Sequence, residues 1–132
     1  MADTAIETTK LTALTTSASR AMNAVAYSGT FVADDTDYHI FRTATSGKSK
    51  FTYAIDNLSD KDLTIDLWGS FDQDAEPGDT GTFQIGTSIT ASATDVIYDT
   101  TADGFVWMFV RCKFAATPDS KVVTVYTYAV PN

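Results

Sequence analysis

Cysteine, histidine, proline and long apolar runs are scarce in this sequence of 132 residues. The single cysteine, Cys112, cannot form an internal disulfide, which argues against a disulfide-stapled secreted module and fits assembly in a reducing cytosol. No stretch approaches the roughly 20 apolar residues of a membrane span. The first ten residues carry acids and no apolar run, so they lack the pattern of a signal peptide. We therefore expect no association with membranes.

Basic residues are also few, and the formal net charge is −8. Residues 56–80 hold eight acids and one base, Lys61, which places a net charge of −7 in this short segment. The remainder of the chain is nearly neutral. A strongly negative field repels phosphate backbones, so the sequence disfavours nucleic-acid binding.

The residues that usually carry catalysis are missing or isolated. His39 has no recognisable nucleophile or orienting partner in the sequence, and we interpret it as a residue of a strand. Cys112 alternates with Val110 and Phe114 on an apolar face, as a buried free cysteine does. The glycines are scattered singly and form no phosphate-binding loop. We therefore expect a protein that is not an enzyme and has no cofactor.

The acidic segment contains one pattern that metal sites use. Asp72, Asp74 and Glu76 have the alternating spacing of calcium-binding loops, but Pro77 and Phe83 stand where an EF-hand needs Gly and Glu. Two interpretations stay open, a solvated acidic loop and a calcium site of another type.

Threonine is abundant, with 22 residues, and such β-branched side chains favour strands. Apolar alternation and turn signals predict strands over 38–43, 50–56, 62–70, 83–89, 94–99, 104–115 and 121–130. We expect the strands at 50–56 and 62–70 to form a hairpin with one buried face. The chain is thus predicted to be all-β, with one domain at residues 31–132. Its architecture is a β-sandwich or jelly-roll-like barrel of about 7–8 antiparallel strands.

Residues 1–30 give a weaker pattern. Leu11, Leu14, Ala18 and Met22 fall near helical spacing, whereas the many Thr and Ser residues around them suit an extended arm. We expect an N-terminal arm, either extended or with a short helix, that reaches across its own domain or a neighbouring subunit.

Aromatic residues stand on the strand faces that should point away from the core. Trp68, Phe105, Trp107 and Phe109 alternate with the aliphatic positions, so this second face must also be covered. The cover is either the same chain or another subunit. Because aromatic anchors dominate interface energetics, these residues are candidate contacts, together with Ile6, Leu11 and Leu14 of the arm.

Three segments, residues 56–64, 107–113 and 118–126, resemble small β-sandwich structural proteins encoded by tailed viruses, typically head decoration (cement) proteins. The shared pattern is a D-N-x-S-D-x-D-x-T turn, a strand with a W-x-x-x-R-x-K-like run and a final P-x-S-x-x-V-T-V-Y hairpin. This resemblance implies binding to a capsid lattice, oligomerisation and a terminus that crosses to a neighbour. It implies no catalytic residues.

These observations predict a non-catalytic virion structural protein of a bacteriophage or related tailed virus. It would decorate and stabilise the capsid after assembly in the host cytoplasm. Its expected partners are the major capsid protein or other virion subunits, and further copies of itself in a homo-oligomer. The alternative is a carbohydrate- or receptor-binding β-sandwich module of a viral fibre or adhesin. A small enzyme is a third hypothesis, which would require a cleft lined by convergent polar groups.

Overall fold

The computed structural model describes residues 4–10, 25–32, 35–46, 48–102, 105–119 and 122–131. These residues form strands and turns and contain no helix, so none of them forms a helical membrane span. Eight long strands follow two very short ones, β1(Thr4–Ala5) and β2(Thr9–Lys10). The long strands are β3(Val25–Val32), β4(His39–Ala44), β5(Lys50–Asn57), β6(Leu63–Ser70), β7(Thr82–Ala91), β8(Val96–Thr101), β9(Trp107–Phe114) and β10(Val122–Val130).

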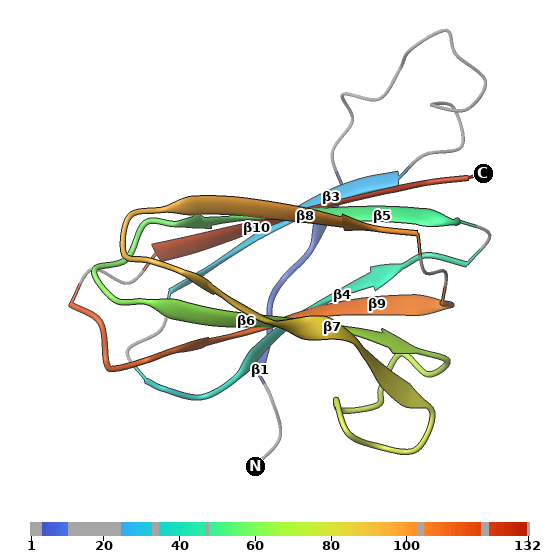
Figure 1. The fold of residues 1–132 in the computed structure, drawn as a ribbon, viewed down its shortest axis with the longest axis horizontal. Coiled ribbons are helices and arrows are strands. Elements are labelled where there is room, and N and C mark those ends of the chain that lie inside the picture. The colour runs from blue at the N-terminus through green and yellow to red at the C-terminus, as the bar shows by residue number, and fades with distance from the viewer. Residues whose placement is uncertain are drawn as a thin grey trace, which may run out of the picture.

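The strands form two sheets that lie one above the other (Figure 1). Sheet A has the order β1-β4-β9-β6-β7, and sheet B has the order β2-β3-β10-β5-β8. The long strands pair in a nested series, β3 with β10, β4 with β9, β5 with β8 and β6 with β7, all antiparallel. This rolled-up antiparallel ribbon is a jelly roll. The predicted all-β sandwich is therefore confirmed, and the strand order selects its jelly-roll form.

The predicted hairpin between residues 50–56 and 62–70 is wrong. Both strands are present, but β5 belongs to sheet B and β6 to sheet A, so the intervening turn crosses from one sheet to the other. The apolar alternation that we interpreted as a shared face arises because Ile55 and Leu63 face the same inter-sheet core from opposite sides.

The core fills the space between the sheets. Its fully buried members include Phe41 from β4, Phe51 from β5 and Phe114 from β9. The strong alternation of β9 predicted this packing, because Met108, Val110, Cys112 and Phe114 all belong to the core.

The N-terminal segment of residues 4–10 closes one side of the sandwich. β1 lies parallel to β4 in sheet A, and β2 lies antiparallel to β3 in sheet B, so the chain crosses between the sheets (Figure 1). Ile6, between these strands, is 5% exposed and belongs to the core. A Cβ on Gly29 would overlap the Glu7 carbonyl oxygen, so this glycine lets the segment lie against β3. The sandwich also begins earlier than residue 31, because β3 starts at Val25.

Candidate interaction surfaces

The outward aromatic row of β9 is covered in part by its own chain. Phe109 is 0% exposed, and the Arg42 guanidinium carbon lies 5.0 Å from the centre of its ring. Arg42 also donates a hydrogen bond of 3.2 Å to the Ala75 carbonyl, which fastens the acidic loop of residues 71–81 to sheet A. Ala75 itself is buried. Phe109 is therefore not a free contact residue, because Arg42 covers it.

An ion pair occupies the next position of the same face. Arg111 and the buried Asp66 are paired across β9 and β6 and make two hydrogen bonds, of 2.7 and 3.3 Å. The Trp68 indole N–H donates to the same carboxylate at 3.2 Å, and the Tyr38 ring lies 3.8 Å from the Arg111 guanidinium carbon. Trp68 is half-buried in this network. Its indole is thus fixed by the ion pair and presents only part of its surface.

Of the arm residues predicted as contacts, only Ile6 lies among the described residues. Leu11 and Leu14 lie outside them. Ile6 is buried in the core of its own chain, because the N-terminal segment inserts it between the sheets. Ile6 therefore does not provide a contact surface, and the prediction is corrected for this residue.

A cleft of about 340 Å³ brings the N-terminal segment, the acidic loop and the aromatic row together. Its lining includes Thr8 from the segment, Gln73 from the loop and the half-buried Trp107 from β9. Arg42 lines it as well, with a side chain that is 17% exposed. The volume and the mixed lining are in the range of small-ligand sites.

A second cleft, of about 390 Å³, lies at the opposite edge, between β7 and β8. Tyr53, Asp99 and Gly86 are among its lining residues. Gly86 has a φ of +70° and lies where the β6–β7 register shifts, so this edge strand bulges there. Such a bulge interrupts the regular edge that another strand would need for pairing.

The acidic loop does not gather its carboxylates. Asp72 accepts a hydrogen bond from the Asp74 backbone N–H, whereas Glu76 lies 3.9 Å from Arg42. Within the described residues, no three His, Cys, Asp or Glu side chains are grouped so that they could hold a metal ion. Asp72, Asp74 and Glu76 thus make local turn and ion-pair contacts.

His39 and Cys112 are both buried by the sandwich. The His39 ring stacks on Phe31 at 4.6 Å, and its Nε2 lies 3.1 Å from Asp35 Oδ1. This hydrogen bond holds the pKa of Asp35 below its usual range. Cys112 is 0% exposed, and burial raises the pKa of its thiol. Neither side chain is presented to solvent as a reactive group would be.

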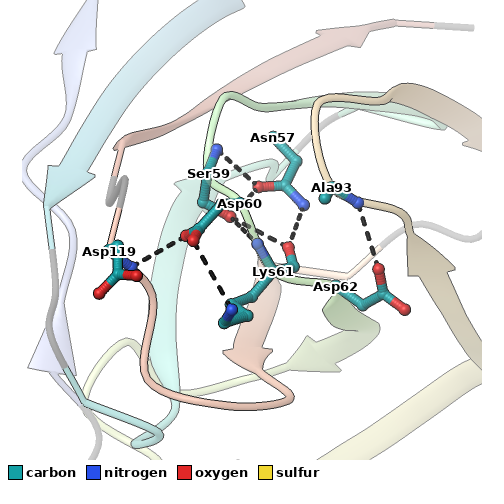
Figure 2. Close-up of polar contacts among 7 residues, drawn as sticks. All are labelled: Asn57, Ser59, Asp60, Lys61, Asp62, Ala93 and Asp119. Atoms are coloured by element: carbon teal, nitrogen blue, oxygen red, sulfur yellow. Dashed lines mark hydrogen bonds and ion pairs between the residues drawn. The ribbon is translucent and has the colours of Figure 1, made fainter.

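The turn that joins β5 to β6 is a closed hydrogen-bond network (Figure 2). The fully buried Asn57 side chain accepts hydrogen bonds from the Ser59 N–H and hydroxyl. It donates to the carbonyls of Lys61, Ala91 and Ser92.

Two aspartates of the same turn bind backbone groups of other connections. Asp60 accepts from the Asp119 N–H, and Asp62 accepts from the Ala93 N–H. This turn supplied part of the family resemblance. Its residues link three connections that each cross from one sheet to the other, namely β5–β6, β7–β8 and β9–β10.

An exposed aromatic cluster joins the predicted contact residue Phe105 to Phe71 and Phe83, which the sequence did not indicate as contacts. Their ring centres lie 5.6 to 6.2 Å apart, and Phe71 and Phe83 are 62% and 51% exposed. Phe105 forms the half-buried base of this cluster, because its ring lies on Gly69, where any Cβ would overlap it. The available signal in the sequence was a pair of aromatic residues beside a polar loop, Phe71 at its start and Phe83 just after it.

No protein-family model and no curated protein sequence matches the chain. Several solved structures resemble it. A surface-associated copper-binding protein of Methylomicrobium album BG8 aligns with 79% of this chain and 93% of its own, at 9% identity and a TM-score of 0.49. A Bacillus endospore appendage pilus protein aligns with 83% of this chain and 88% of its own, at 11% identity and a TM-score of 0.48.

The K3 adhesin domain of Lys-gingipain from Porphyromonas gingivalis W83 aligns with 82% of this chain and 74% of its own. Its identity is 7% and its TM-score is 0.47. At such identities and scores these likenesses carry no argument about function. The fold rests on the strand order of the chain itself.

Proposed function

We propose that this protein is a non-catalytic structural module that decorates a viral capsid through protein–protein contacts. The observation that carries the proposal is the exposed aromatic cluster. Phe71 and Phe83 are exposed and held in place by ring contacts with each other and with Phe105. Rings that are already ordered lose little side-chain freedom on binding and are typical anchors of protein interfaces.

Two further features support this proposal. The jelly roll is used by capsid and other binding domains, although a fold alone does not determine a function. His39 and Cys112, the one histidine and the one cysteine of the sequence, are buried in the sandwich. On this proposal the protein is located in the virion, where its partners are the major capsid protein or other virion subunits.

The test is the double variant Phe71→Ser/Phe83→Ser, compared with wild-type protein on purified particles of the virus that encodes it. Because both rings are exposed, the variant should keep its circular dichroism spectrum and lose at least about tenfold in particle affinity. Leu58→Ser, which changes another half-exposed apolar residue at the β5–β6 turn, is the matched control and should bind normally.

Cryo-electron microscopy of the particles is expected to show the sandwich on the capsid with the aromatic cluster against the lattice. Absence of the protein from purified particles would refute the proposal. Normal binding by the double variant would show that another surface makes the contact.

The cleft beside Trp107 favours one other function, a carbohydrate- or receptor-binding module of a viral fibre or adhesin. Trp107 offers a ring on which a sugar can stack, and Thr8, Gln73 and Arg42 offer polar groups around it. Binding on a glycan array that is abolished by Trp107→Ala but unchanged by Phe71→Ser/Phe83→Ser would support this second candidate.

A further inference from the structure

The outer face of sheet B carries almost no charge. The outward-pointing residues of β3, β10, β5 and β8 are Ala, Ser, Thr, Val and Tyr, apart from Lys50 and Asp56. Several of them are well exposed, with Val32 at 65%, Val96 at 61%, Tyr98 at 77% and Tyr126 at 42%. In a chain with a net charge of −8, this is a broad neutral surface.

The polar groups of this face are partly paired with one another. The hydroxyls of Thr30 and Thr124 are 3.0 Å apart, and those of Thr52 and Thr100 are 2.9 Å apart. Each pair spans neighbouring strands, so one hydroxyl already donates to the other. Covering these threonines therefore removes their methyl groups from water without leaving all of the hydroxyls unsatisfied.

The two charges of the face stand at opposite ends of one strand. Lys50 and Asp56 are the outward residues at the two ends of β5, six residues apart, which is about 20 Å along an extended strand. If a second copy lies face to face with its β5 antiparallel to the first, Lys50 of each copy lies over Asp56 of the other. The face is then complementary to itself in charge.

We propose that two copies of this chain associate through the outer faces of their B sheets. The two-fold axis lies in the interface, perpendicular to the strands, and passes over the middle of β5 near Tyr53. Each long strand then stacks on its own equivalent, and both copies contribute the same patch, so the interface is isologous. The register also places the large Tyr98 opposite the smaller Thr100 of the second copy, because these two β8 residues pair with Ala54 and Thr52, which flank Tyr53 on β5.

The area of this face determines how tightly we expect the two copies to associate. Four strands about 4.8 Å apart and eight residues long cover about 500 Å² of flat sheet, so two copies bury about 1,000 Å². This is near the lower bound for a specific interface, so the dimer should dissociate on dilution. The surface formed by residues 60–80 is less suited to self-association, because these residues hold seven acids and one base and repel their own copy.

The test measures mass by sedimentation velocity over a wide range of concentrations of the full chain. Wild-type protein should pass from monomer to dimer as concentration rises. Asp56→Lys places two lysines opposite each other and should weaken the dimer by at least about tenfold. The exchange variant Lys50→Asp/Asp56→Lys restores opposite charges and should restore most of the affinity.

Asp119→Lys is the matched control, because it makes the same change of net charge at an exposed position in the turn before β10. It should dimerise at least as well as the wild type. A wild-type monomer at every concentration, or a trimer, would overturn the inference. Failure of the exchange variant to recover, when its circular dichroism is normal, would overturn the proposed orientation.

This dimer does not depend on the proposed capsid role. A dimer that binds no particle would leave the inference standing, and a monomer that binds particles would leave the proposed function standing.

Discussion

Cys112 shows how far the environment of one residue sets its chemistry. The thiol is 0% exposed, its sulfur lies 3.7 Å from the His39 carbonyl oxygen, and burial raises its pKa. The native protein should therefore react with a thiol-specific disulfide reagent about a thousandfold more slowly than the unfolded chain in urea. A single cysteine at exposed position 90, as Thr90→Cys in a Cys112→Val background, should react rapidly. Rapid reaction of native wild-type Cys112 would contradict the buried placement.

The free energy of unfolding should depend on pH in the alkaline range because of Tyr53. Burial, together with the negative charges of Asp99 and Asp66, raises the pKa of Tyr53 to about 12. The unfolded chain loses this proton near pH 10, whereas the native protein keeps it. The stabilisation from neutral Tyr53 is thus complete below pH 10 and is lost between pH 10 and 12, by up to about 1.4 kcal/mol per pH unit.

Urea unfolding at pH 9, 10, 11 and 12 tests this expectation against Tyr53→Phe, which lacks the ionisable hydroxyl. The difference in unfolding free energy between the two proteins should be constant below pH 10 and should fall above it. A constant difference up to pH 12 would mean that Tyr53 ionises alike in the folded and unfolded states.

At the scale of elements, the crossing between β5 and β6 depends on one amide. Asn57 is 0% exposed, and its side chain joins its own turn to the carbonyls of Ala91 and Ser92 before β8. Asn57→Ala should lower the free energy of unfolding by about 3 kcal/mol, because it leaves several buried groups without partners. Gln84→Ala, at an exposed position of β7, should change stability by less than about 0.5 kcal/mol. Equal stability of the two variants in urea would refute this role.

The same turn shows what the sequence could and could not predict. Alternation located seven of the eight long strands, because one side of each strand faces the core. It could not assign β5 and β6 to different sheets, since a strand has the same alternation whichever sheet it joins. The strand β3 was missed because Ala26, Ser28 and Gly29 give it little apolar alternation.

The contact residues illustrate the same limit. The aromatic row of β9 indicated a covered second face, and the structure shows that this face is covered in part: Phe109 is buried, whereas Trp107 is half-buried. Only the structure shows that Arg42 lies over Phe109 and that the loop of residues 71–81 is fastened beside it. The cluster of Phe71, Phe83 and Phe105 depends on contacts between residues distant in sequence. No periodic pattern could have predicted it.

At the scale of the whole molecule, the N-terminal segment closes the jelly roll on its own chain. Ile6 is buried in the core, and the Ile6 N–H donates to the Ile40 carbonyl at 2.9 Å. Deleting residues 1–10 should therefore lower the free energy of unfolding by about 3 kcal/mol, since it empties the Ile6 site and frees an edge of each sheet. Because the segment contacts its own chain, the mass in solution at a given concentration should stay the same.

Gly29→Ala tests the same contact without shortening the chain. The added methyl group would overlap the Glu7 carbonyl, so it should displace the segment and lower stability by about 1–3 kcal/mol. If the segment instead joined subunits, the deletion would turn dimers into monomers while the folded monomer kept its stability. Urea unfolding and sedimentation of both variants separate these outcomes, because closure within one chain changes stability, whereas exchange between chains changes mass.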